Sequence, residues 1–123
     1  MVQDFKNLQI WKESFDFGIE VYKTVIPKIP EKDSYGGINS QLQRAVLSIS
    51  NNISEGCGRK TNRDFANFLH NAIGSCKEVE NLLLFVNKLG YISDEKHKEL
   101  NDKLDLLGKK LMSFLKIIAS KGD

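Results

Sequence analysis

Residues 41–56 read QLQRAVLSISNNISEG and decide the fold of this chain. In and just before this stretch, apolar residues recur every three or four positions, which is the spacing of one face of an α-helix. These residues are Ile38, Leu42, Ala45, Ile49 and Ile53. The pattern fades at Gly56, and glycine readily ends a helix. It therefore predicts a helix over 35–56, with Ser34 as its N-terminal cap.

The same spacing recurs before this stretch. It predicts a helix over 5–26 that ends at Pro27, because proline lacks the N–H group that an interior helical position must donate. The predicted apolar face of this helix consists of Leu8, Trp11, Phe15, Ile19, Tyr22 and Val25 or Ile26.

Two further helices are predicted after the stretch, over 62–89 and 94–119. Thr61 and Ser93 can cap their N-termini with side-chain oxygens, and Gly90 suits a left-handed C-terminal cap. The apolar face of the first consists of Phe65, Phe68 or Leu69, Ala72, Cys76, Val79, Leu83 and Val86. The apolar face of the second consists of Leu100, Leu104, Leu107, Leu111, Phe114 and Ile118.

Four helices of similar length with short connections are typical of one architecture. No alternating apolar and polar pattern of a β-strand interrupts them. A chain of 123 residues is long enough for one domain with its own core. The sequence therefore predicts an all-α fold, an antiparallel up-down-up-down four-helix bundle, in a single domain over residues 1–123.

Composition narrows the class of protein further. The net charge of +2 at pH 7 is too small to require an anionic partner. The first residues lack the apolar segment of a signal peptide, and no stretch approaches the roughly 18 apolar residues of a membrane span. Cys57 and Cys76 have neither C-x-x-C spacing nor a histidine at zinc-site spacing. We expect two reduced thiols in a cytoplasmic protein.

No group of residues in the sequence predicts catalysis. His70 and His97 lie on different predicted helices, without the His-Glu-x-x-His or Glu-x-x-His spacing of helical metal sites. Nucleotide-binding glycine loops and the G-x-S-x-G turn of hydrolases do not occur. Cys57 lies in a glycine-flanked turn with no activating base beside it. We expect no catalytic residue, metal, cofactor, small-molecule substrate or membrane contact, and a protein that is not an enzyme.

The helices predicted over 35–56 and 62–89 each carry a polar stripe. Ser, Asn, Gln, Gly and single charges occupy it, instead of the many Lys and Glu residues of the solvated face of 94–119. Such residues let helices approach closely and form hydrogen bonds, so we expect the two stripes to face each other or another subunit. A solvated flank is the alternative. The stripe of the helix over 35–56 consists of Gln41, Arg44, Ser48, Asn52 and Glu55. The stripe of the helix over 62–89 consists of Asn67, Asn71, Gly74, Glu78 and Asn81.

The charges of the two stripes and the opposite face of the helix over 35–56 lead to two further observations. Arg44 and Glu78 are the main charges of their stripes, and we expect a charge-assisted contact between them within one chain or between chains. The opposite face of the helix over 35–56 has small or mixed side chains with little of the charge of a solvated surface. It consists of Gln43, Leu47, Ser50 and Ser54.

A basic cluster follows the glycine turn. Arg59, Lys60 and Arg63 lie in the connection and in the first turn of the helix over 62–89, where outward-pointing backbone N–H groups favour anions. Arginine forks suit phosphate recognition better than dispersed lysines. We expect this cluster to contact RNA or DNA phosphates. The alternative is a solvated loop in which Glu55 and Asp64 neutralise the cluster.

The stretch that decides the fold also resembles a known family. Its Gln41-x-x-Arg44-Ala45, Ser48-Ile49 and Asn52-Ile53-x-Glu55-Gly56 elements resemble the four-helix-bundle proteins related to the 23S rRNA intervening-sequence protein. Less specific matches extend over nearly the whole chain. They are Phe5, Leu8 and Trp11; Tyr22; Pro30 with Tyr35-Gly36; Phe65, Phe68 and Leu69; Gly74-Ser75 with Glu78; and Leu89-Gly90.

The resemblance implies a bacterial protein, often encoded within inserts in ribosomal RNA genes. It also implies a homopentameric ring similar to the accessory protein of diversity-generating retroelements, which binds a reverse transcriptase and nucleic acid through a basic surface. It implies no activity and no cofactor. We therefore expect an oligomeric accessory protein that binds RNA or DNA through Arg59, Lys60 and Arg63. The alternative, which the small net charge favours, is a protein-interaction scaffold without direct nucleic-acid contact.

Overall fold

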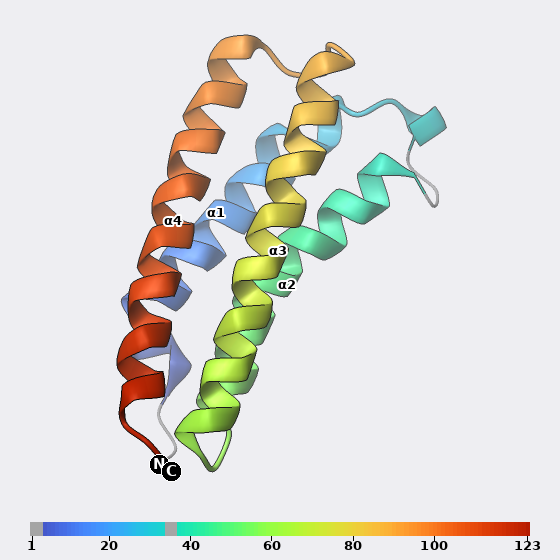
Figure 1. The fold of residues 1–123 in the computed structure, drawn as a ribbon. Helices are drawn as coiled ribbons and strands as arrows, with labels where there is room; N and C mark the ends of the chain where they lie inside the picture. The colour runs from blue at the N-terminus through green and yellow to red at the C-terminus, as the bar shows by residue number, and fades with distance from the viewer. Residues whose placement is uncertain (1–3, 34–36) are drawn as a thin grey trace.

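Four α-helices pack into one bundle (Figure 1). The structure is a computed structural model that describes residues 4–33 and 37–123. Within these residues it contains no β-strand, so the predicted all-α four-helix fold is confirmed. In Figure 1, α1 and α2 lie behind α3 and α4. The helices are α1 (Gln9–Thr24), α2 (Ile38–Cys57), α3 (Asn62–Lys88) and α4 (Asp94–Ser120).

The first predicted helix is shorter than expected. Three short 3₁₀ turns flank or follow α1: η1 (Phe5–Asn7), η2 (Ile26–Lys28) and η3 (Glu31–Asp33). Leu8 is extended and separates η1 from α1. Pro27 lies inside η2, so α1 ends at Thr24 before the proline can remove one of its hydrogen bonds. A continuous helix over 5–26 is therefore wrong at both ends.

The other helix ends follow the predicted capping chemistry. Thr61 and Ser93 accept hydrogen bonds from backbone N–H groups three residues ahead, at 3.1 and 3.0 Å. Gly90 has a φ of 84°, and the N–H of Tyr91 reaches back to the carbonyl of Val86 at 3.0 Å. This is the hydrogen bond of a Schellman cap. The expected start of α2 at 35 and its cap Ser34 lie outside the described residues.

The predicted core faces of α2, α3 and α4 are confirmed, with Ile38 and Phe114 at their margins only partly buried. The predicted face of α1 is wrong at its centre, because Phe15 and Ile19 are 44% and 40% exposed. Its remaining members are buried or pack partly buried against the core; they are Leu8, Trp11, Tyr22, Val25 and Ile26. The face of α1 that is buried in the core consists of Ile10, Ser14, Phe17 and Val21. The hydroxyl of Ser14 tolerates this position because it donates a hydrogen bond to the carbonyl oxygen of Ile10 at 2.8 Å.

Two glycines allow the helices to approach closely. A Cβ atom on Gly18 would lie 3.1 Å from Val46, where α1 crosses α2. A Cβ atom on Gly56 would lie only 2.7 Å from the Cβ of Phe68 on α3. The glycine turn after α2 therefore positions the α2–α3 end of the bundle as well as ending the helix.

Candidate functional site

The basic cluster lies at one end of the bundle, in the green turn between α2 and α3 at the bottom of Figure 1. Arg59 and Lys60 follow Gly58, whose N–H group donates to the Glu55 carbonyl at 3.2 Å as α2 ends. Arg63 lies in the first turn of α3. All three basic side chains are exposed, so the turn presents three cations at the same end of the molecule.

Arg59 is held by two partners from its own chain. Its Nη2 lies 3.6 Å from Glu55 Oε2, and its guanidinium carbon lies 4.5 Å from the ring centroid of Phe68. The stack over Phe68 fixes the direction of the side chain, while Glu55 partly neutralises it. Because this ion pair is exposed, a phosphate could displace Glu55 at little cost.

Lys60 and Arg63 make no ion pair with the described residues. An acidic group already occupies the adjacent helix N-terminus, however, since the N–H of Asn62 donates to Asp123 Oδ1 at 2.8 Å. This contact shows that the exposed N–H groups of α3 favour an anion. Among residues 4–33 and 37–123, the cluster thus contains two cations without an ion pair, one anchored arginine and nearby carboxylates.

Among the described residues, the centre of the α2 polar stripe contacts α3 through Ser75, which lies outside the stripe predicted for α3; the five members of that predicted stripe are exposed. Ser75 Oγ lies 2.8 Å from Ser48 Oγ and 3.2 Å from the carbonyl oxygen of Asn71. The side-chain amide of Asn52 donates to Ser48 Oγ at 2.9 Å. Small polar residues here let α2 and α3 pack closely with their hydroxyls satisfied. The outer residues of the stripes, Gln41, Arg44, Glu55, Asn71 and Glu78, are exposed.

The expected contact between Arg44 and Glu78 does not form within the chain. Neither side chain takes part in an ion pair among residues 4–33 and 37–123, and both are exposed. The packing of α2 against α3 places Ser48 and Ser75 in the interface and leaves the two charges on its outer edge. A contact between Arg44 and Glu78 of different chains stays a prediction.

The structure reveals a surface that the sequence analysis had assigned to the core. Trp11, Phe15 and Ile19 form a second apolar face of α1, which we call the α1 outer stripe. The rings of Trp11 and Phe15 stack with centroids 4.9 Å apart, and Phe5 packs edge-on against Trp11 at 5.0 Å. Leu47 on α2, 47% exposed, continues this apolar surface.

A groove of about 230 Å³ runs between the α1 outer stripe and α2. Its α2 wall includes Leu47, Ser50 and Ser54, the face whose small and mixed side chains were noted in the sequence. Tyr22 closes one side and donates a hydrogen bond to Gln43 at 3.3 Å. The low charge of this α2 face was the sequence signal for an apolar surface, since a solvated face would carry more Lys and Glu.

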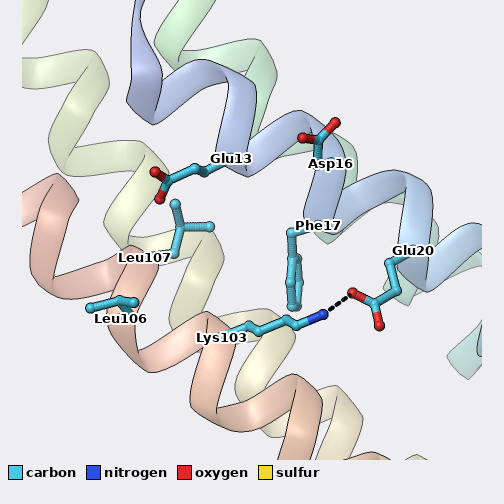
Figure 2. A pocket seen from close by; sticks show the side chains of 7 residues that line it. All are labelled: Glu13, Asp16, Phe17, Glu20, Lys103, Leu106 and Leu107. Carbon is cyan, nitrogen blue, oxygen red and sulfur yellow. Dashed lines mark hydrogen bonds and ion pairs between the residues drawn. The ribbon is translucent and has the colours of Figure 1, made fainter.

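A second groove, between α1 and α4, is lined by carboxylates (Figure 2). Glu13, Asp16 and Glu20 lie along α1, and Phe17 projects between them towards α4. Glu20 forms ion pairs of 2.8 Å with Lys103 and with Lys96, and Glu13 forms one of 2.9 Å with Lys110. These pairs also show that α1 and α4 run antiparallel.

The electrostatics of this second groove indicate a structural role. Burial alone would raise the pKa of Glu20, but hydrogen bonds from Lys103 and Lys96 outweigh it and lower the pKa to about 2. Hydrogen bonds from Lys110 and Gln9 likewise lower the pKa of Glu13. A general acid or base works best with a pKa near the operating pH. These carboxylates instead stay ionised and tie α1 to α4.

The two cysteines are the remaining side chains with nucleophilic chemistry that the sequence analysis considered. Cys57 and Cys76 are both buried, and burial raises the pKa of Cys76 to about 12, so its thiol is a poor nucleophile. In the part of the chain that the structure describes, no three His, Cys, Asp or Glu side chains are grouped to hold a metal ion. No helix among the described residues is long and apolar enough to cross a membrane.

Comparison with known proteins places the chain in a family. The family model described as 23S rRNA-intervening sequence protein matches residues 6–113. The chain belongs to this family. The match of the 23S rRNA-intervening sequence protein family includes α1, α2, α3 and most of α4, so it contains both the α1 outer stripe and the basic cluster.

A solved structure supports the same fold. It is a crystal structure of a protein of unknown function from the S23 ribosomal protein family of Bacteroides thetaiotaomicron VPI-5482. The TM-score is 0.79 at 23% sequence identity, over 87% of this chain and 98% of the other. No curated protein matches the chain significantly. Neither the description of the 23S rRNA-intervening sequence protein family nor that of the S23 neighbour names an enzymatic activity.

Proposed function

We propose that the protein is a non-enzymatic accessory protein that self-associates and contacts RNA or DNA phosphates through its basic end. The α1 outer stripe carries the proposal. It exposes Phe15 and Ile19 next to Trp11, and Leu47 of α2 extends it. A contiguous apolar surface of this kind marks an interaction site in a water-soluble protein. Trp and other aromatic residues are also common at the centres of protein interfaces.

Self-association predicts a measurable mass. One chain has a mass of 14.0 kDa. Light scattering after size-exclusion chromatography at micromolar concentration should give several times this value, and five copies is the number that the family resemblance favours. A single peak at the mass of one chain would remove the self-association part of the proposal.

The basic end supports the nucleic-acid part of the proposal. Lys60 and Arg63 are exposed without an ion pair from the described residues, and Arg59 is oriented by Phe68. Three cations on one chain make a weak site, because Glu55 and Asp64 lie close by. In an oligomer the site is repeated, and several weak contacts to one nucleic acid combine into useful avidity.

Replacing Arg59, Lys60 and Arg63 together by Gln should test this part. Binding of the unmodified protein to a single-stranded RNA or DNA should fall steeply between low and physiological salt. The triple variant should lose about tenfold in affinity at low salt and show a shallower salt dependence, since each lost phosphate contact lowers the slope by about one unit. Fluorescence anisotropy with a labelled oligonucleotide measures both.

A matched control replaces Lys98, Lys109 and Lys116 by Gln. These three lysines are exposed on α4, so the control changes the net charge equally without touching the basic end. Its affinity should stay within about threefold of the unmodified protein if local contacts rather than net charge govern binding. Equal losses in both variants would contradict a site at Arg59, Lys60 and Arg63.

The alternative is a protein-interaction scaffold that makes no nucleic-acid contact. The ion pair of Arg59 with Glu55 and the contact of Asp123 with the start of α3 favour it, because both reduce the positive field at the basic end. No binding at low salt, or unchanged binding by the triple variant, would leave the scaffold as the better description.

A further inference from the structure

A pocket lined by three lysines lies at the end of the bundle opposite the basic cluster, and we call it the lysine pocket. It has a volume of about 690 Å³ and lies between the end of α1 and the connection from α3 to α4. This connection is at the top of Figure 1, whereas the basic cluster is at the bottom, so the two features are separate. The pocket is lined by Lys23, Lys28 and Lys96, with Tyr91 and Ser93 beside them.

The charge of the lysine pocket is of one sign. None of its described lining residues is acidic, whereas three carboxylates and one lysine line the groove between α1 and α4. Lys23 and Lys28 are exposed and form no ion pair with the described residues. The pocket therefore has an excess of positive charge that an anionic ligand would compensate.

Lys96 is the ordered member of the three lysines. Its Nζ lies 2.8 Å from Glu20 Oε2 and 3.3 Å from Glu99 Oε1, and its side chain is only 23% exposed. The hydrogen bond to Glu20 is the main cause that raises the pKa of Lys96, so its ammonium group stays protonated. An ammonium group has three protons, and two of them point to these carboxylates, so one remains for a ligand. Lys96 thus adds a fixed donor to two lysines that have no fixed partner.

Ser93 and Tyr91 add a neutral donor and an aromatic wall. The Oγ atom of Ser93 accepts the N–H of Lys96 at 3.0 Å, which leaves its own O–H without an acceptor among the described residues. The hydroxyl of Tyr91 donates a hydrogen bond to Asp33, so the ring is held in place where it lines the pocket. A fixed aromatic ring is a surface on which a nucleobase can stack.

We propose that the lysine pocket binds a nucleoside diphosphate, with the phosphates at the three lysines and the base beside Tyr91. Ammonium groups form charge-assisted hydrogen bonds with phosphate oxygens, and the Ser93 hydroxyl adds one neutral donor. The pocket is much larger than an inorganic phosphate needs, and its volume lies within the roughly 300–1,000 Å³ of small-molecule sites. The site does not depend on self-association or on nucleic-acid contact at the basic cluster.

Isothermal titration calorimetry with ADP at about 0.15 M salt tests the proposal, since charges more than roughly 8 Å apart are screened there. The unmodified protein should bind one ADP per chain. The double variant Lys23→Gln/Lys28→Gln should bind ADP at least about tenfold more weakly, because it loses two charge-assisted contacts. Circular dichroism confirms that the variant keeps its helices.

The matched control is Lys12→Gln/Lys116→Gln. Both lysines are exposed on helices, form no ion pair with the described residues and lie outside the lysine pocket. Its net charge equals that of the double variant, but its affinity for ADP should stay within about twofold of the unmodified protein. Equal losses in the two variants would show that net charge governs binding and would overturn the site.

Pyrophosphate and adenosine separate the two halves of the ligand. Each should bind more weakly than ADP, because each meets only the lysines or only the aromatic wall. Pyrophosphate that binds as tightly as ADP would overturn the role of Tyr91, and adenosine that does so would overturn the role of the lysines.

Two further results would contradict the proposal as a whole. The first is an unmodified protein that binds no ADP. The second is ADP binding that the double variant keeps and that the variant with Gln at Arg59, Lys60 and Arg63 loses, since this result would place the nucleotide at the basic cluster.

Discussion

Replacing Gly56 by alanine is expected to lower the free energy of unfolding by about 1–3 kcal/mol, the usual range for overpacking a tight contact. A Cβ atom at this position would lie 2.7 Å from Phe68 Cβ and 2.9 Å from a ring carbon of Phe65. The Cβ of Phe68 cannot rotate away, because it is fixed by the α3 backbone. The two helices must therefore separate locally. Urea or thermal unfolding followed by circular dichroism measures the loss.

Gly58→Ala is the matched control for this variant. It lies two residues further along the same turn, with a φ of −88° that any residue adopts. A Cβ atom there would meet only the Glu55 carbonyl oxygen at an ordinary 3.6 Å. Its free energy of unfolding should change by less than about 0.5 kcal/mol. Equal effects of the two substitutions would mean that loss of glycine flexibility, and not helix packing, sets the cost.

Replacing Glu20 by Gln should lower the free energy of unfolding at pH 7 by about 1–2 kcal/mol, between the values for exposed and buried ion pairs. Glu20 accepts hydrogen bonds from both Lys96 and Lys103, and the side chains of Glu20 and Lys96 are only 21% and 23% exposed. The variant keeps the shape of the side chain but leaves both ammonium groups without their shared carboxylate. Chemical denaturation at pH 7 gives the difference.

The ion pairs of Glu20 with Lys96 and Lys103 also predict that the stability of the fold depends on pH. The pKa of Glu20 is about 2 in the folded chain against an ordinary value of 4.5, so its contribution is complete above pH 4.5 and is lost as the pH falls towards 2. Glu20→Gln should therefore lose less stability over this range than the unmodified protein. Asp102→Asn, which breaks the exposed pair with Lys98, should change the stability at pH 7 by under about 0.5 kcal/mol. Parallel acid titrations of all three proteins would contradict the assignment to Glu20.

Helices α3 and α4 could be predicted nearly to the residue because the longest apolar stripe of each is the one that is buried. Their ends also follow from local chemistry, with Thr61 and Ser93 as caps and Gly90 in the left-handed conformation. The observed bounds, Asn62–Lys88 and Asp94–Ser120, each differ by one residue from the predicted ranges. In these two helices the apolar periodicity and the capping residues indicate the same start and end, and the packing of the bundle does not shift them.

Helix α1 could not be assigned in the same way, because it carries two apolar stripes with helical spacing. The stripe with the larger rings lies at the edge of the core, with Trp11 partly buried and Phe15 exposed, whereas the buried stripe is interrupted by Ser14. Sequence spacing cannot show that the Ser14 hydroxyl is satisfied by a backbone carbonyl and so can enter the core. The prediction therefore placed the larger side chains inside, and the candidate interaction surface was missed.

The candidate basic cluster was predictable only as a set of positions. Its placement in one turn follows from the helix ends, but the stack of Arg59 on Phe68 depends on how closely Gly56 lets α2 approach α3. The approach of Asp123 to Asn62 joins residues 61 positions apart, which no local pattern encodes. The partners that tune the charge of this turn thus required the tertiary structure.

The reactivity of the two buried cysteines can serve as a measure of how the bundle opens. Cys57 and Cys76 lie on different helices, and the raised pKa of Cys76 keeps its thiol protonated at neutral pH. An alkylating reagent attacks the thiolate of an accessible cysteine, so modification under native conditions must wait for the helices to open. The rate of mass increase therefore reports the opening of the bundle under native conditions.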